Sequence, residues 1–345
     1  MPFDLSMPAP RPGLSPGDVV LTGDRPTGPL HLGHLSGSLA ARVVAQDTCA
    51  QTVLVADLQA LTDHAHDPGR VRAGVVEVVR DYLAAGLDPA RTVIALQSGL
   101  PGVAELTMLL MNVVGEGRVL RNPTVKAEIE AKGFAGGVPL AFALYPVSQA
   151  ADILAFAATA VPVGEDQRPM IELAEEIAGR LNAMGGKPLP VPRGVYPDGH
   201  GGRLPGVDGR KASKTFGNAV PLGSTEGGID KLVRKMKSDP GRTGPGSPGD
   251  PDATVTFAYL RAFDPDREGL SALEAAYRMG EVGDGDVKAR VARVLQTLLA
   301  PVRDRRASIG ESEALDVLRD GTARARLTVE RTLDGVRGRF GIRGI

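Results

Sequence analysis

Two histidines near the start of the chain have a spacing suited to phosphate binding. His31 and His34 lie three residues apart, so on a helix they share a face and can both donate to one phosphate chain. Gly33 between them has no side chain, so a flat base can approach the backbone. Residues 22–29 are rich in turn formers, and a helix beginning near His31 offers unpaired N–H groups to an anion. We predict a nucleotide-phosphate site here; the alternative is a strand-turn-helix unit with two surface histidines.

A second group of candidate charges lies much later in the chain. It is the run Lys211-Ala212-Ser213-Lys214-Thr215. Residues 185–209 before it are dense in glycine and proline, which predicts a loop throughout and one that can move. When a carboxylate attacks the α-phosphate of ATP, negative charge builds on the phosphate oxygens, and positioned histidine and lysine donors stabilise it. On their own, Lys211 and Lys214 are more typical of a solvated loop.

The elements that must position these residues alternate between strand and helix. Apolar runs at 19–21, 52–56 and 92–96 predict buried strands, and helical patterns separate them. The predicted helices cover 35–47 and 68–86. This alternation predicts an α/β fold with a Rossmann-like, doubly wound parallel sheet. Ligands lie at the carboxyl ends of such strands, where Thr22, Asp57 and Gln97 are expected.

Helices are predicted for most of the remaining chain. Residues 103–159 predict a helical insertion whose apolar face suits either a dimer interface or the core of the subunit. A fourth strand is predicted at 161–164, and a helix follows it. After a Pro- and Gly-rich linker at 239–252, Asp286 can cap a further helix. Residues 226–345 are therefore expected to form an all-helical domain.

The end of the chain carries an excess of positive charge. Six arginines and only two acidic residues lie between 322 and 345. Contact with phosphate groups and a solvated helix face are equally good interpretations of this charge.

Composition limits the protein class and its location. With 345 residues the chain suits two domains, and 42% hydrophobic and 23% charged residues are ordinary for a soluble protein. The net charge of −1 requires any nucleic-acid surface to be a local patch. The single cysteine, Cys49, excludes an internal disulfide and a cysteine-based zinc site. No apolar run suits a membrane span, and residues 1–17 predict a disordered tail, so we expect a cytoplasmic protein without membrane contact.

The two charged motifs together resemble the paired signatures of class I aminoacyl-tRNA synthetases, usually written HIGH and KMSKS. Three further segments are similar to motifs of tryptophanyl-tRNA synthetases, at 56–62, 145–154 and 161–167. The resemblance is dense over residues 18–220 and looser beyond. It implies a class I catalytic domain over 18–225, with 103–159 as a dimer interface, and a tRNA anticodon-binding domain over 226–345.

The resemblance also implies an activity and a set of site residues. ATP, with Mg²⁺, would activate L-tryptophan to tryptophanyl-adenylate, and the amino acid would pass to tRNA(Trp) on a homodimer. The implied catalytic residues are His31, His34, Lys211 and Lys214. The implied ATP-binding residues are Thr22, Gly23, Arg25, Gly33, Val163, Gly164, Asp166 and Ser213. The implied tryptophan-binding residues are Leu21, Gln59, Tyr145, Gln149, Asp152 and Gln167.

Asp152 matches the acid that accepts the indole N–H in this family. Physical chemistry agrees, because an acid in the apolar stretch 150–154 is costly to bury unless a donor reaches it. A substrate without that donor would leave the carboxylate unpaired. The alternative is an aspartate that faces solvent or pairs with an arginine.

The sequence departs from the family pattern at several positions. Gln59 stands where many bacterial members have histidine, Ala212 replaces the loop methionine, and Thr215 replaces the final serine. We therefore suggest that the chain resembles the divergent second copy found in some bacteria. Three alternatives remain: a tyrosyl-tRNA synthetase, whose pocket also uses an aspartate; a nucleotidyltransferase without an RNA partner; and a weakly active paralogue with a binding or regulatory role.

Overall fold

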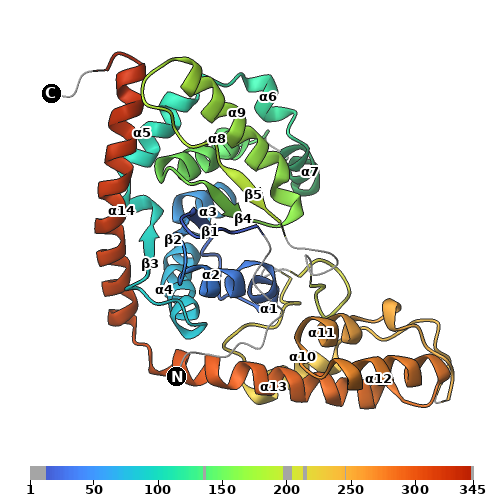
Figure 1. Ribbon diagram of the computed structural model, residues 1–345. Helices are drawn as coiled ribbons and strands as arrows, with labels where there is room; N and C mark the ends of the chain where they lie inside the picture. Colours follow the sequence, from blue (N-terminus) through green and yellow to red (C-terminus); the bar gives the residue numbers. More distant parts are fainter. Residues whose placement is uncertain (1–12, 135–136, 197–203, 213–215, 245, 343–345) are drawn as a thin grey trace.

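A parallel sheet lies at the centre of the molecule (Figure 1). The computed structural model describes residues 13–134, 137–196, 204–212, 216–244 and 246–342. Within them the sheet has five strands in the order β3-β2-β1-β4-β5, and each neighbouring pair is parallel. The strands are β1 (Val19–Asp24), β2 (Ala50–Val55), β3 (Thr92–Leu96), β4 (Ala160–Pro162) and β5 (Arg193–Val195). The order reverses between β1 and β4, and ligands of such sheets bind at that switch point.

The predicted Rossmann-like α/β class is confirmed, with two local differences. The loop predicted for 185–209 contains β5, which pairs with β4 at the edge of the sheet. Pro192 precedes this three-residue strand, and an edge strand tolerates a neighbouring proline because one of its sides stays unpaired. Strand β1 continues to Asp24, so Thr22 lies within the strand and not at its end.

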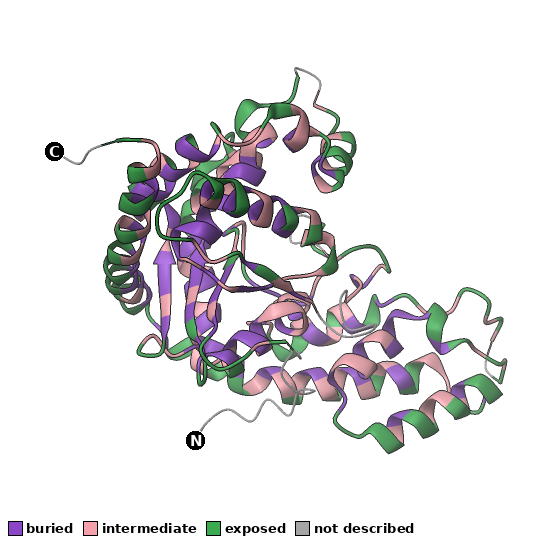
Figure 2. Cartoon of the chain, turned by 45° about the horizontal axis from the view of Figure 1, so that its top comes forward, coloured by how far each residue is buried: buried purple, intermediate pink, exposed green. Residues whose placement is uncertain are grey.

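Helices cover both faces of the sheet. Val53 and Ile94 point into one core cluster, whereas their neighbours Leu54 and Ala95 point into another, as the alternation of side chains along a strand requires. Figure 2 shows the strands as largely buried between these layers. The helices before β4 are α1 (Leu32–His34), α2 (Ala40–Ala45), α3 (Asp57–His64), α4 (Pro68–Ala84), α5 (Pro101–Leu110), α6 (Glu116–Leu120), α7 (Pro123–Lys132) and α8 (Leu140–Ala155). A π-helical turn, Leu35–Leu39, joins α1 to α2.

The helical character predicted for 103–159 is confirmed, and its apolar residues divide between two environments. Leu106 and Leu110 of α5 are buried in the core of the subunit. Met108 on the same helix is 64% exposed, and Leu140 at the start of α8 is 72% exposed. One side of α5 therefore forms part of the core of the subunit, while its other side is exposed.

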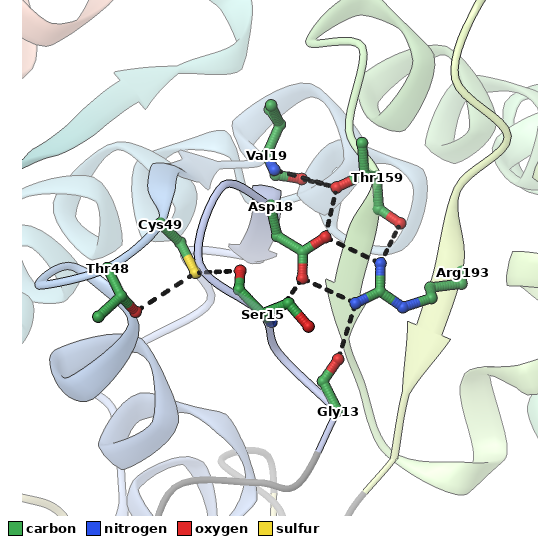
Figure 3. A network of polar contacts seen from close by, with 8 residues as sticks. All are labelled: Gly13, Ser15, Asp18, Val19, Thr48, Cys49, Thr159 and Arg193. Carbon is green, nitrogen blue, oxygen red and sulfur yellow. Dashed lines mark hydrogen bonds and ion pairs between the residues drawn. The ribbon is translucent and has the colours of Figure 1, made fainter.

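A polar network joins the start of β1 to the edge strand β5 (Figure 3). Both carboxylate oxygens of Asp18 accept hydrogen bonds from the Arg193 guanidinium, at 2.9 and 2.7 Å. Thr159 donates to Asp18, and the backbone N–H of Val19 donates to Thr159. The hydrogen bonds from Arg193 hold the pKa of Asp18 well below its usual range. This network fixes the amino end of the short strand β5 beside β4, at the edge of the sheet opposite to the carboxyl ends of the strands.

The remaining helices lie after β4 in the sequence. They are α9 (Arg168–Ala183), α10 (Glu226–Arg234), α11 (Val255–Phe263), α12 (Arg267–Met279), α13 (Asp284–Ser308) and α14 (Glu311–Arg339). Helices α10 to α13 pack together at one side of the molecule (Figure 1). Asp286 accepts from the Gly283 N–H within the first turn of α13, so it caps that helix from inside. Among the described residues, no helix is long and apolar enough to cross a membrane.

Helix α14 packs along β3 and not with the other C-terminal helices (Figure 1). The Thr322 hydroxyl accepts from the Leu96 N–H at 2.9 Å. Basic residues of α14 also form contacts with the rest of the protein: Arg326 donates to the Gly99 carbonyl, and Arg337 pairs with Glu105. The sequence predicts that the helical domain covers 226–345, but its last helix, α14, packs against the sheet instead. Arg324, Arg326 and Arg331 nevertheless stay exposed, so contact of this helix with phosphate groups remains a prediction.

Candidate active site

The two histidines lie at the junction between β1 and the first helix, in a fixed geometry. The backbone N–H of Gly33 donates to His31 Nδ1 at 3.1 Å, and the backbone N–H of His31 donates to His34 Nδ1 at 3.3 Å. The ring centroids are 3.9 Å apart. A neutral imidazole whose Nδ1 accepts carries its proton on Nε2, so both rings present an Nε2–H donor. A Cβ on Gly33 would lie 2.9 Å from the His31 ring, so only glycine fits.

Backbone hydrogen bonds tie the histidine segment to the segment that follows the lysine motif. The N–H of Leu32 donates to the Val220 carbonyl, and the N–H of Leu222 donates to the Leu30 carbonyl, both at 2.9 Å. His31 and Pro221 form an isolated antiparallel bridge between these contacts. The histidine motif is therefore adjacent in space to the segment 220–222 that follows the lysine motif.

Lys211 extends from the second motif toward the switch point. Its Nζ lies 4.0 Å from Asp166 Oδ2, and its side chain is 71% exposed. The Asn218 side chain donates to the Lys211 carbonyl at 3.1 Å, which holds the backbone of the turn. The predicted residues Ser213 and Lys214 lie outside the described part of the chain.

Several of the predicted ATP-binding residues lie in β1 or directly after β4. The Val163 N–H donates to the Val195 carbonyl, and Gly164 precedes the short 3₁₀ turn η3 (Glu165–Gln167). A Cβ on Gly164 would lie 2.7 Å from Asp166 Oδ1, so a larger residue would displace that carboxylate. Thr22 Oγ1 is buried, and the described residues provide no hydrogen-bond partner for it.

Gly23 and Arg25 have evident packing partners within the protein. A Cβ on Gly23 would lie 2.9 Å from the Leu54 carbonyl oxygen, so the contact with β2 already requires glycine. Arg25 pairs with Asp63 at 2.5 Å, and Lys132 pairs with the other oxygen of Asp63 at 3.0 Å. The Arg25 side chain is 44% exposed, so it remains within reach of a ligand.

Asp152 is a buried carboxylate that forms no ion pair with an arginine or lysine among the described residues. It lies on α8 and is 5% exposed. Gln97 Nε2 donates to both of its oxygens at 2.9 Å. Burial raises the pKa of Asp152 to about 7, the hydrogen bond from Gln97 opposes this shift, and the charge of Asp57 adds to it. The alternatives of a solvent-facing or arginine-paired aspartate are therefore wrong.

Gln97 is a site residue that sequence reasoning placed only at the end of a strand. It is 2% exposed and follows β3 directly. Its Oε1 accepts from the Gln59 backbone N–H at 3.1 Å, while its Nε2 donates to Asp152. Gln97 thus links two of the predicted tryptophan-binding residues, from α3 and α8. Its position at the carboxyl end of a predicted strand was the available signal.

The other predicted tryptophan-binding residues lie in three places. Gln149 on α8 donates to the Gln167 side chain of η3 at 3.4 Å, which joins two of them. The Tyr145 hydroxyl donates to Glu128 on α7 at 2.9 Å, and burial raises the pKa of Tyr145 well above its usual range. Leu21 is buried in the core cluster below the sheet.

Known proteins share similarity with this chain over most of its length. The sequence profile of the family described as tRNA synthetases class I (W and Y) matches residues 18–300. The chain belongs to this synthetase family. It is 45% identical over 331 residues to the tryptophan–tRNA ligase of Clostridium longisporum, covering 94% of this chain and 97% of that protein. The tryptophan–tRNA ligase of Lactococcus lactis is also 45% identical, with 94% and 98% covered.

Solved structures of the family share the fold of this synthetase. The tryptophanyl-tRNA synthetase of Campylobacter jejuni, complexed with ADP and tryptophan, has a TM-score of 0.81 and 27% identity, covering 94% of this chain and 99% of that one. The tyrosyl-tRNA synthetase of Archaeoglobus fulgidus, complexed with L-tyrosine, has a TM-score of 0.66 at 20% identity, covering 85% and 91%. The second likeness shows the fold alone.

A buried cluster beside the histidines of this synthetase was not found from the sequence. Asp24 at the end of β1 accepts from Arg42 at 2.5 Å and from the Tyr82 hydroxyl at 2.7 Å. Burial would raise the pKa of Asp24, but the charge of Arg42 and the hydrogen bond that it donates outweigh burial and hold this pKa well below its usual range. Asp24 therefore carries a negative charge next to the histidine segment.

The segment Asp63-His64-Ala65-His66-Asp67, at the end of α3, contains four side chains of the types that bind metal ions. No three His, Cys, Asp or Glu side chains lie close enough to hold a metal ion among the described residues. Asp63 instead forms ion pairs with Arg25 and Lys132.

Proposed function

We propose that this protein is an aminoacyl-tRNA ligase that activates L-tryptophan with ATP and transfers it to tRNA(Trp). The observation that carries the choice of amino acid is Asp152, a buried carboxylate whose two oxygens accept from Gln97 alone among side chains in the hydrogen bonds described. An indole N–H satisfies such an acceptor, and a ring that lacks a donor there leaves it underpaired. The near full-length likeness to tryptophan–tRNA ligases supports the same choice.

The chemistry is a displacement at the α-phosphorus of ATP. A tryptophan carboxylate oxygen bonds to phosphorus, the bond to the β-phosphate bridging oxygen breaks, and pyrophosphate leaves. A ribose hydroxyl of the terminal tRNA nucleotide then attacks the adenylate carbonyl, and AMP leaves. The protein positions these groups and stabilises the negative charge that develops.

The first motif and the lysine turn supply donors for this charge in our proposal. His31 and His34 donate to the phosphates through their Nε2–H groups. Lys211 and Lys214 are assigned as the cationic donors to the same phosphates. Lys211 Nζ lies 4.0 Å from Asp166 Oδ2, and in this proposal a phosphate of ATP replaces that carboxylate as the partner of Lys211. We assign Asp166 to the ribose hydroxyls.

Mg²⁺ enters the site as part of MgATP in this proposal. The described residues provide no set of three protein ligands for a metal ion. Magnesium is commonly held by substrate phosphates with one or two carboxylates, so a nucleotide-bound ion fits the residues present.

The RNA partner and the oligomeric state belong to the same proposal. We assign contact with tRNA phosphates to α10 and the residues after it, where Lys231, Arg234 and Lys235 are exposed. We assign the homodimer interface to the packed pair α5 and α8, which exposes Met108 and Leu140. A cytoplasmic location goes with the single free Cys49.

Amino-acid-dependent pyrophosphate exchange tests the proposal. We expect exchange of pyrophosphate into ATP with tryptophan, none with tyrosine, and subsequent charging of tRNA(Trp). Exchange with tyrosine would favour the tyrosyl alternative. Exchange without charging would favour a nucleotidyltransferase without an RNA partner, and neither activity would favour a binding or regulatory paralogue.

A further inference from the structure

A fully buried acid connects the C-terminal helices to the histidine segment. Asp81 on α4 has no exposed surface, and each of its oxygens has one strong partner. Oδ2 accepts from the Leu30 backbone N–H at 2.6 Å, one residue before His31. Oδ1 accepts from Arg306 Nε of α13, also at 2.6 Å. Asp81 therefore contacts the nucleotide motif on one side and a distant helix on the other.

Helix α13 also contacts the chain that follows the lysine motif. The Arg303 guanidinium donates to the Ser224 carbonyl at 3.4 Å. A Cβ on Gly223 would lie 2.9 Å from Arg306 Cδ, so Arg306 packs against the backbone of this turn. Leu222 in turn donates to the Leu30 carbonyl. The Arg306 side chain thus lies between the segment before the histidines and the segment after the lysines.

The Arg306 side chain is held from several directions. Its side chain is only 16% exposed, it also pairs with Glu77, and Arg80 donates to its carbonyl at 3.2 Å. A guanidinium held this way keeps a fixed geometry, because its planar donors fit two carboxylates at once. The position of Leu30 is therefore set by α13 through Asp81 and not by α4 alone.

We propose that Asp81 is a positioning residue of the nucleotide site, through which Arg306 of α13 holds the His31 segment in register. This inference rests on the proposed role of the histidines in binding ATP. Loss of the Asp81 acceptor frees the Leu30 N–H, and the histidine rings shift relative to the phosphates. Tryptophan binding at Asp152 depends on other elements, α3, α8 and the end of β3, so it is unaffected.

The test compares the ATP and tryptophan parameters of single variants in pyrophosphate exchange. Asp81→Asn keeps the volume but replaces one acceptor with a donor. We expect kcat/KM for ATP to fall about ten- to hundred-fold, because small misplacements of positioned groups have effects of this size. The dissociation constant of tryptophan, measured without ATP, should change less than about twofold.

Two variants of Arg306 and one of Arg290 provide rescue and control. Arg306→Gln should reproduce the loss in kcat/KM for ATP, and Arg306→Lys, which keeps the charge, should recover part of it. Arg290 lies on the same helix and pairs with Asp264 at 2.6 Å, with a side-chain exposure of 21%, but has no described contact with the histidine segment. Arg290→Gln should leave the ATP parameters near those of the wild type.

Several results would overturn the inference. An unchanged ATP parameter in Asp81→Asn, an equal loss for ATP and tryptophan, or an equal loss in Arg290→Gln would each show that Asp81 has only a general structural role. Should Asp81→Asn fail to fold, Arg306→Gln compared with Arg290→Gln decides by the same criteria. Absence of tryptophan-dependent exchange in the wild-type protein would instead contradict the proposed function itself.

Discussion

The ionisation of Asp152 should control tryptophan affinity across neutral pH. Burial raises its pKa from 3.8 to about 7, and only the ionised form offers a charge-assisted acceptor to an indole N–H. With this pKa, about a tenth of the carboxyl is ionised at pH 6 and about nine tenths at pH 8. Tryptophan should therefore bind about tenfold more tightly at the higher pH. The dissociation constant is measured by titration calorimetry without ATP.

Two variants separate this effect from other titrating groups. Asp152→Asn has no charge to gain, so its tryptophan affinity should be weak and nearly independent of pH. Asp57→Asn should move the midpoint of the wild-type profile to lower pH, because the Asp57 charge raises the pKa of Asp152. A flat wild-type profile between pH 6 and 8, or a profile unchanged in Asp152→Asn, would refute the reasoning.

The same shift affects the stability of the fold. A carboxyl with a raised native pKa binds more protons in the folded state than in the unfolded state between about pH 4 and 7. Its contribution to stability is therefore present at low pH and is lost as pH rises through that window. Asp152→Asn should unfold at higher denaturant concentration than the wild type at pH 8 and show less difference at pH 4.

Three further predictions follow from single positions. Lys211→Ala should lower the rate of pyrophosphate exchange about a hundredfold without changing the melting temperature, since a donor to developing charge is lost from an exposed side chain; an unchanged rate would remove Lys211 from the site. Gly321→Ala should destabilise the protein by about 1–3 kcal/mol in urea unfolding, because its Cβ would lie 2.0 Å from the Ile94 oxygen. Gly335→Ala on the same helix places its Cβ with nothing within 4 Å, so it should not destabilise the protein. Gln59→His should increase inhibition by an indole analogue in the exchange assay, and equal inhibition would discard the suggestion of a divergent second copy.

Local sequence patterns predicted the parts of this fold that depend on neighbouring residues. The strands β1 to β3 and the helix α4 follow from apolar runs and helical spacing, and the structure has them close to the expected bounds. The motif around His31 was predicted because a turn, a glycine and two histidines occur within one short segment. Strand β5 was missed since three residues among prolines carry no periodic signal.

The contacts that organise the site join residues far apart in the chain. Gln97 is 55 residues from Asp152, and Asp81 is 225 residues from Arg306. A lone polar residue at the end of a strand, or one aspartate within a helix, has no local feature that identifies its partner. Only the packing of α3 against α8 and against residues 97–99, and of α13 against α4, brings these groups together.

The two edges of the sheet explain why the last helix could not be assigned from its own sequence. An edge strand presents unpaired backbone groups that other chains can pair with, so proteins shorten or cover it. Strand β5 is short and follows Pro192, whereas β3 is longer and is covered by α14. Thr322 accepts the Leu96 N–H at this edge, and Gly321 lets the helix backbone approach Ile94. Helix α14 therefore completes the catalytic sheet, although its charged sequence and its place after α13 resemble those of a solvent-exposed helical domain.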